Sequence, residues 1–258
     1  MPVQGEFFQN PGGASGFYEF QIQKSVHFER GASHNTYMSR ALSSSAGTNS
    51  TWGMSVWVKR GITGDSHSYI LGNGAGYHQT GFDSSDYFSS TTGGGGQKIQ
   101  PQASSTSDPR TFRDTSSWMH IVLGSGSSSS DRFMYVNGVA QTLSTSTWNG
   151  WSYFYGGQDL NVGASNNGSS GTRTLGGQLA ELHVLYGSTP TYTDFGKFKQ
   201  GVWIPIQATG ISYGTYGFYL DFKNASNLGE DQSGNNNDFT VNNMDAGNQN
   251  TDTPTFTE

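Results

Sequence analysis

The stretch with the strictest pattern in this chain is WGMSVWVK, residues 52–59. Trp52, Met54, Val56 and Val58 stand at every second position. Such a period of two is that of an extended strand, whereas the faces of a helix repeat about every 3.6 residues. The stretch therefore predicts a strand with one face in an apolar core and with Trp57 on the opposite face.

Shorter stretches of the same kind follow along the chain. Met119, Ile121 and Leu123 alternate with their neighbours, and Asn137-Gly138 separates two short apolar runs. An Asn-Gly pair in that position predicts a β-hairpin with a two-residue turn of type I′. The one helix-compatible stretch, residues 193–199, is interrupted by Gly and predicts no more than a helical turn.

Composition agrees with a fold made of short strands and turns. Charged residues make up 12% of the 258 residues, and there are 37 glycines. The hydrophobic fraction of 32% is low, but disordered chains are depleted in aromatic residues and this one has 14%. The composition therefore predicts a folded, polar-surfaced, all-β protein.

Charge and cysteine content exclude several classes of function. A net charge of −6 does not suit a general nucleic-acid binder, which needs clustered Lys and Arg. Without cysteine the chain has no disulfide and no thiolate metal site. No apolar run approaches the roughly 18 residues of a membrane span, and the N-terminal residues do not resemble a secretory signal. We expect no nucleic-acid partner, no membrane insertion, and synthesis in a cytoplasm without export.

The strand-like segments resemble a known family when they are read in order. They are SVHFERG, TYMSRALS, TWGMSVWVKRG, WMHIVLG, FMYVNGV, GGQLAELHVLYG and the closing FYLDFKNASNLGEDQSGNNNDFT. Together they are similar to LamG-like, concanavalin A-type jelly-roll proteins of marine bacteriophages, such as fibre or virion-surface proteins. The resemblance covers about residues 24–253. It implies an all-β fold of two antiparallel sheets in a jelly-roll sandwich with a short N-terminal arm.

The predicted organisation is an N-terminal arm, residues 1–23, followed by one LamG-like jelly-roll domain, residues 24–258. The domain includes residues 217–253, which alternate like strands around a dense Asp/Asn/Ser/Gly turn and predict a C-terminal β-hairpin. In many LamG-like proteins a related element precedes the strand that corresponds here to Ser25–Arg30. Two interpretations follow: the hairpin closes its own domain in a circularly shifted arrangement, or it pairs with a neighbouring subunit.

The arm is rich in aromatic residues. Phe7, Phe8, Phe17 and Tyr18 would be unfavourable if they were left in water. One interpretation is an anchor that docks on a virion partner or a sister subunit. The other is a flexible terminus.

A second group of aromatic residues suggests carbohydrate binding, because aromatic rings stack on sugar faces. The candidate residues are Trp57, Trp148, Trp151, Tyr153 and Tyr155, the last four in one unusually aromatic loop. The alternative is that the loop packs against a neighbouring subunit or closes one end of the sandwich, since interfaces are also enriched in Trp and Tyr.

The C-terminal turn offers the one candidate metal site. Asp231, Ser233, Asn235, Asn237 and Asp238 supply alternating oxygen atoms around Gly234, and calcium binds about 6–8 oxygens. Asn and Asp side chains also hydrogen-bond to their own backbone in tight turns, without any metal. Calcium is therefore the one cofactor to consider, and a purely structural turn is the alternative.

Catalytic patterns are missing from the sequence. A retaining glycosidase needs two carboxylates about 5 Å apart, and the E-x-D-x-(x)-E pattern that would supply them is absent. The nearest strand carries Glu181 with Leu and His around it, and the positions of Asp83 and Asp86 are typical of solvated turn residues. The six histidines are not spaced like the ligands of a metal site. The positions of His120 and His183 are typical of sheet residues with ordinary hydrogen bonds.

The expected function combines the residues with the resemblance. We expect a non-enzymatic bacteriophage virion protein, a tail fibre, spike or capsid-decorating subunit, that presents a LamG-like module to a host-surface glycan. Its partners would be other virion proteins and further copies of itself, most simply as a homotrimer on the virion surface. The alternatives are a free lectin-like carbohydrate-binding protein and a glycan hydrolase.

Overall fold

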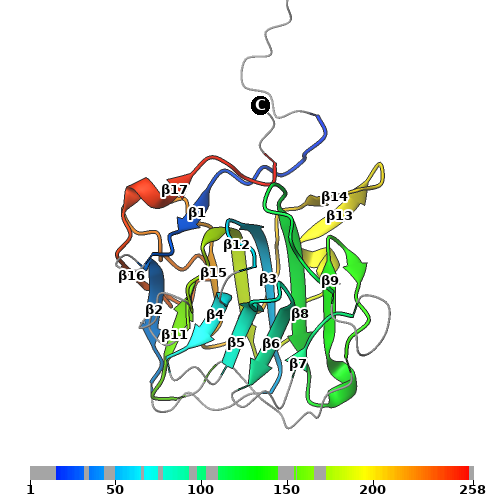
Figure 1. Cartoon of the computed structure of the whole chain (residues 1–258), viewed down its shortest axis with the longest axis horizontal. Helices are drawn as coiled ribbons and strands as arrows, with labels where there is room; N and C mark the ends of the chain where they lie inside the picture. The colour runs from blue at the N-terminus through cyan, green and yellow to red at the C-terminus, as the bar shows by residue number, and fades with distance from the viewer. Residues whose placement is uncertain are drawn as a thin grey trace, which may run out of the picture.

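The computed structural model describes residues 16–31, 35–43, 50–64, 67–74, 78–92, 98–102, 110–144, 154, 156–165 and 173–255. Two large antiparallel sheets pack face to face in these residues, and a small two-stranded sheet stands beside them (Figure 1). The predicted all-β jelly-roll sandwich is confirmed. In the described part of the chain, no helix is long and apolar enough to cross a membrane.

In the described residues sheet A has eight strands, and β15 joins it by pairing with β12 on the side where β1 lies. Its strands, in spatial order, are β10 (Val139–Ala140), β9 (Phe133–Val136), β8 (Met119–Ser125), β3 (Trp52–Arg60), β12 (Gly177–Tyr186), β1 (Ser25–Phe28) and β17 (Gln249–Asn250), with β15 (Phe218–Leu220) off this path.

Sheet B has seven strands in the part of the chain that the structure describes. In spatial order they are β16 (Thr240–Asn242), β2 (Tyr37–Ala41), β11 (Asp159–Val162), β4 (Ser68–Asn73), β5 (His78–Phe82), β6 (Phe88–Thr92) and β7 (Lys98–Ile99). Three short 3-10 turns complete the described elements: η2 (Ser129–Asp131), η5 (Tyr192–Asp194) and η6 (Ala246–Asn248).

The apolar core lies between the two sheets. Trp52, Met54, Val56 and Val58 of β3 are all fully buried in it, as the alternation predicts. Full burial of a side chain of this kind stabilises the fold by about 1.5–3 kcal/mol. The opposite face of β3, which carries Trp57, is the outer face of sheet A.

The C-terminal segment is not a hairpin, and this prediction is wrong. β15 pairs with β12 in sheet A, whereas β16 pairs with β2 in sheet B. The turn between them therefore connects one sheet to the other. Phe218 and Phe239 contact each other in the core between the sheets, with ring centroids 4.6 Å apart. β17 then returns to sheet A and pairs with β1.

These pairings all lie within one chain. Of the two interpretations of the segment, closure of its own domain is the one that the structure shows. The end of the N-terminal arm lies next to the C-terminal residues, since the Ile22 backbone N–H donates to Thr255 Oγ1 at 2.9 Å.

An antiparallel hairpin, β13 (Gly196–Lys199) with β14 (Val202–Pro205), covers part of the outer face of sheet A. The predicted helical turn is confirmed only as η5, just before β13. Trp203 of β14 and Ile22 of the N-terminal segment pack with Trp57 and Ala180 in a second, smaller apolar cluster. The β13–β14 hairpin and the N-terminal segment thus cover part of the outer face of sheet A.

A β-bulge interrupts the pairing of β12 with β3 between Ala180 and His183. Leu179 and Leu182 both belong to the core, although a regular strand would place residues three apart on opposite faces. Glu181 is the extra residue, with a φ of +48°, and the bulge turns its side chain to the outer side.

Candidate functional site

A groove runs over the outer face of sheet A, between the tips of the β9–β10 and β13–β14 hairpins and the C-terminal residues 252–254. We call it the outer groove; its volume is about 610 Å³. Its lining residues are Trp57, Lys59, Ser116, Trp118, Asn137, Val139, Phe198, Gly201, Val202, Trp203, Asp252, Thr253 and Pro254.

Stacked rings form the floor of the outer groove. The Trp57 ring stacks on His120 at 4.7 Å between centroids, and His120 stacks on Trp203 at 6.0 Å. Trp203 Nε1 donates to His120 Nδ1 at 3.0 Å, which leaves His120 Nε2–H to donate to Ser55 Oγ at 2.8 Å. These bonds fix the orientation of the Trp203 indole.

Two glycines make room for the same indole. A Cβ at Gly138 would lie 2.2 Å from Trp203 Cε3, and a Cβ at Gly196 would lie 2.4 Å from Trp203 Cζ2. Gly138 belongs to the predicted Asn-Gly turn, which is confirmed as type I′ because Asn137 and Gly138 both have positive φ, 49° and 74°. The turn therefore shapes the floor of the groove as well as joining two strands.

Apolar side chains stand at the rim. Val139 is 56% exposed, Phe198 53% and Val202 49%, and no other large apolar side chain of the described residues is exposed to this degree. All three line the outer groove. Exposed apolar side chains that gather at one place indicate a binding surface, whereas scattered ones need no explanation.

Polar groups lie between the floor and the rim. Asp252 accepts from Trp118 Nε1 at 3.0 Å through one oxygen and from Lys59 Nζ at 2.8 Å through the other. Burial raises the pKa of Asp252, but the hydrogen bonds from Lys59 and Trp118 outweigh it, so the pKa lies below its ordinary value. The exposed Asn137 side chain is held by its Oδ1, which accepts from the His120 backbone N–H at 2.7 Å.

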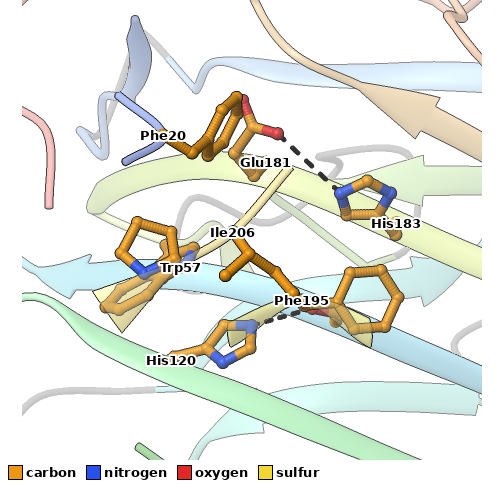
Figure 2. Close-up of a pocket in the computed structure, with 9 residues that line it drawn as sticks. Phe20, Trp57, His120, Glu181, His183, Phe195 and Ile206 are labelled. Carbon is orange, nitrogen blue, oxygen red and sulfur yellow. Dashed lines mark hydrogen bonds and ion pairs between the residues drawn. The ribbon is translucent and has the colours of Figure 1, made fainter. Parts of the chain in front are cut away.

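Beside the floor, on the same outer side of sheet A, lies a buried polar cluster around Glu181 (Figure 2). Tyr219 donates its hydroxyl to Glu181 Oε2 at 2.5 Å, and His183 Nε2 lies 3.9 Å from the same oxygen. The His183 ring stacks on Tyr219 at 4.0 Å, and its Nδ1 lies 2.7 Å from the Tyr213 hydroxyl. Glu181 Oε1 is buried and has no partner among the described residues.

Burial controls the ionisation of this cluster. It raises the pKa of Glu181 to about 7, against the opposing hydrogen bond from Tyr219. It lowers the pKa of both His120 and His183 to about 3, so both rings are neutral at ordinary pH. The cavity beside them has about 10 Å³, the room that one water molecule needs. The cluster has no space for a substrate.

The sequence matches the family model described as "Concanavalin A-like lectin/glucanases superfamily" over residues 11–190, more than half of the chain. The chain belongs to this family. The matched region ends before β13, so the hairpin of the outer groove and the strands β15, β16 and β17 lie beyond it.

The chain is also similar to several solved structures. A protein from Bacteroides ovatus, described as a candidate carbohydrate-binding protein, has a TM-score of 0.56 and 16% identity, and the match covers 86% of this chain and 59% of that protein. A heptameric SAP-like pentraxin from Limulus polyphemus has a TM-score of 0.48 and 12% identity, covering 67% of this chain and 80% of the pentraxin. Mouse laminin α1 domains LG4-5 have a TM-score of 0.43 and 11% identity, with 72% and 45% covered. No curated protein matches the sequence.

Among the residues predicted to bind carbohydrate, Trp57 lies on the outer face of the concanavalin A-like sheet A, as expected. It is only 5% exposed, because the β13–β14 hairpin and the N-terminal segment cover it. It still forms part of the groove floor. Trp148, Trp151, Tyr153 and Tyr155 lie outside the described residues.

The predicted metal ligands form a hydrogen-bonded turn. Asp231 accepts from the backbone N–H groups of Tyr219, Ser233 and Asn237 at 2.9 Å each. The Asp231 N–H in turn donates to Asp238 Oδ1 at 2.8 Å.

The two Asn side chains of this turn also point to backbone groups. Asn235 and Asn237 donate their amides to the Gly217 carbonyl at 3.0 and 2.9 Å. All of these Asp and Asn side chains are therefore used by backbone groups of the turn. Of the two interpretations, these bonds favour the purely structural turn over a calcium site.

Of the predicted anchor residues, Phe7 and Phe8 lie outside the described residues. Phe17 and Tyr18 are half-buried and contact each other edge to face, with centroids 5.2 Å apart. Lys199 Nζ of β13 lies 5.7 Å from the Phe17 ring centroid, so this part of the arm lies on its own domain. An anchoring role toward another chain stays a prediction.

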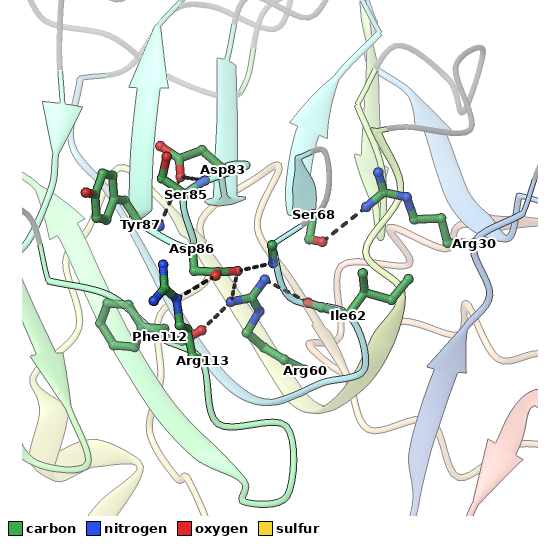
Figure 3. Close-up of polar contacts among 11 residues, drawn as sticks. Arg30, Arg60, Ile62, Ser68, Asp83, Ser85, Asp86, Tyr87, Phe112 and Arg113 are labelled. Atoms are coloured by element: carbon green, nitrogen blue, oxygen red, sulfur yellow. Dashed lines mark hydrogen bonds and ion pairs between the residues drawn. The ribbon is translucent and has the colours of Figure 1, made fainter.

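The interpretation of Asp86 as a solvated residue is wrong (Figure 3). Asp86 is 1% exposed and forms ion pairs with Arg60 at 2.9 Å and Arg113 at 3.0 Å. Burial raises its pKa, but hydrogen bonds from Gly64, Arg113 and Arg60 more than offset this and hold the pKa below its usual value. Asp83 does shape a turn, accepting from the N–H groups of Ser85 and Tyr87. Both residues serve the fold and lie away from the outer groove.

Sequence reasoning missed most of the outer groove. Phe198, Val202 and Trp203 come from a hairpin whose signal was present as the Gln-Gly pair between two short strands. Gln200 and Gly201 both have positive φ, 51° and 81°, which is the geometry of an Asn-Gly turn. No sequence signal brings Asp252 to this groove, because it arrives there from a distant part of the chain.

Proposed function

We propose that the chain is a non-enzymatic carbohydrate-binding protein and that the outer groove is its binding site. The observation that carries this proposal is the convergence of the exposed apolar side chains of the described surface on one groove, which also has an aromatic floor. Sugar rings present weakly polar C–H groups to the electron-rich faces of aromatic rings. Ser116, Asn137 and Asp252 add polar groups at the edges, as ligand sites require.

Two features support a binding role over hydrolysis. Among the described residues that line the outer groove, Asp252 is the single carboxylate, and both of its oxygens are hydrogen-bonded within the protein. The retaining and inverting mechanisms usual among glycosidases need a pair of carboxyl groups. Glu181 does not supply the second, because it is buried in a cavity too small for a sugar.

Titration of the purified protein with a panel of saccharides tests the proposal. Phe198→Ala, which removes an exposed ring from the rim, should weaken binding by about tenfold or more, as for an aromatic contact residue at an interface. Tyr87→Ala is the matched control, because Tyr87 is a half-buried ring in the polar network of Figure 3 and does not line the groove. Equal affinities for the two variants, or release of sugar from a glycan during incubation, would contradict the proposal.

We further propose that the protein stands on the surface of a bacteriophage virion, as a fibre, spike or capsid-decorating subunit, and that it is a homotrimer. The support is the resemblance of residues 24–253 to virion-surface proteins. Mass spectrometry of purified particles and light scattering of the isolated protein test the two parts. Absence from the particles would overturn the first part, and a monomer at micromolar concentration would overturn the second.

A further inference from the structure

We infer that the outer groove selects neutral saccharides that carry a methyl group, such as 6-deoxyhexoses or N-acetylhexosamines, over acidic and fully hydroxylated sugars. This inference rests on the proposed function, because it concerns the ligand of the same groove. It follows from the charges in the groove and from the chemistry of its rim.

The charges of the groove are paired with each other. Among the described lining residues, Lys59 and Asp252 are the charged ones, and they form an ion pair at 2.8 Å. An acidic sugar would have to take Lys59 from Asp252 and would lie against the carboxylate that remains. The protein also carries a net charge of −6, which repels anions at long range. A neutral sugar leaves the ion pair intact.

The rim of the groove is apolar, so a sugar hydroxyl group that lies against it would lose its hydrogen bonds to water without gaining others. Val139 stands at the tip of β9–β10, and Phe198 and Val202 stand on either side of the β13–β14 turn. All three are about half exposed, so a ligand can cover them. A ligand methyl group buried against such surface should improve affinity about fourfold, whereas a hydroxyl group without a partner weakens binding.

The polar groups of the groove would hold the rest of the sugar. Asn137 is exposed and its Oδ1 accepts from the His120 N–H, so its amide NH₂ is the group that can donate to a ligand. The Trp203 ring, held by His120 and by the space at two glycines, is fixed before the ligand arrives. Preorganised groups of this kind lower the cost of binding.

Matched pairs of methyl glycosides test the inference by titration calorimetry or protein-observed NMR. D-fucose against D-galactose differs only in the 6-hydroxyl group, N-acetylglucosamine against glucose tests the acetamide, and glucuronate against glucose tests charge. We expect the methyl-bearing member of at least one of the first two pairs to bind about fourfold more tightly, and glucuronate to bind more weakly than glucose.

Two variants ask whether the rim causes the preference. Val139→Thr and Val202→Thr keep the branched shape and replace a methyl group by a hydroxyl group, so they should remove most of the preference while the protein stays folded by circular dichroism. Val241→Thr, on β16 of sheet B, is the control and should keep it.

The outcomes separate the two proposals. If no saccharide binds, the proposed function fails and the inference fails with it. If saccharides bind but galactose, glucose or glucuronate is preferred, or if the rim variants keep the methyl preference, the inference fails while the proposed function stands.

Discussion

Glu181 shows how much one residue can depend on a backbone irregularity. The bulge places its carboxyl group on the outer side of sheet A, where Tyr219 contacts one oxygen and the other has no partner among the described residues. A buried charge without full hydrogen bonding is costly, so burial favours the protonated form. The sequence indicates a carboxylate on a strand with Leu and His nearby, but it carries no sign of a bulge.

The ionisation of Glu181 should make stability fall as pH rises. The pKa is about 7 in the folded protein, against an ordinary value of 4.5. Because the folded pKa is raised, the stabilisation is complete below about pH 4.5 and is lost as pH rises through 7. The full loss is about 3 kcal/mol.

Glu181→Gln cannot ionise and should escape this loss. Urea unfolding at pH 5 and pH 8 measures it: the free energy of unfolding of the variant should gain about 2–3 kcal/mol on the wild type between the two pH values, because a small part of the loss already occurs below pH 5. Glu19→Gln, at an exposed carboxylate, serves as the control. A parallel pH dependence of wild type and Glu181→Gln would refute the buried ionisation.

The β9–β10 turn both reverses the chain and makes room for the Trp203 indole, and two glycine substitutions can separate these roles. Gly138→Ala forces a side chain into a left-handed backbone and into the Trp203 indole, 2.2 Å away. Gly201→Ala, in the β13–β14 turn, has the same kind of backbone, with φ +81°, but its Cβ would meet nothing within 4 Å.

We expect Gly201→Ala to lower the free energy of unfolding by about 1–2 kcal/mol, the cost of the left-handed conformation alone. Gly138→Ala should cost about 2–4 kcal/mol because the indole must also move. Chemical unfolding measures the costs, and tryptophan fluorescence should shift for Gly138→Ala. Equal costs and an unchanged spectrum would mean that the turn does not hold Trp203.

The turn of residues 231–238 needs no metal to hold its shape. Its Asp and Asn side chains already bond to backbone groups, so the melting temperature of the protein should be the same in calcium and in EDTA. Asp231→Ala should lower it, since the Tyr219, Ser233 and Asn237 N–H groups each lose an acceptor at a cost of about 1 kcal/mol or more in total. A rise in melting temperature with calcium that Asp231→Ala abolishes would instead establish a metal site.

Strands with a regular alternation of apolar residues are predictable from the sequence, whereas the sheet that each strand joins is not. The face of β3 and the Asn-Gly turn follow from local rules, and both are confirmed. β15 and β16 were recognised as strands, but their local pattern does not say which sheet each one joins. The β13–β14 hairpin was missed because Thr193–Lys199 also fits a helical turn, and its burial of Trp57 was missed with it.

For the whole molecule, the C-terminal segment is a structural part of the sandwich. Phe218, Leu220 and Phe239 are buried in the core, and β16 and β17 complete one sheet each. A chain that ends at residue 206 loses these contacts. Because each such side chain contributes about 1.5–3 kcal/mol and a typical domain has only about 5–15 kcal/mol of stability, the shortened chain should not fold cooperatively.

Thermal unfolding followed by circular dichroism measures this prediction. A chain that ends at residue 255 is the control and should unfold like the full protein, because it keeps Thr255 and its hydrogen bonds to Ile22. A cooperative transition for the shorter chain would show that the segment is dispensable.

Because the first strand, β1, pairs with the last one, β17, sheet A cannot be completed until nearly the whole chain has been synthesised. β1 ends at Phe28, while its partner β17 begins at Gln249. At about 5–20 residues per second, a ribosome needs on the order of tens of seconds to make the chain between them. Both sheets stay incomplete during that time, with an open edge to which another nascent chain can add. Slower translation or a higher concentration of nascent chains should therefore lower the yield of native protein more than any single surface substitution would.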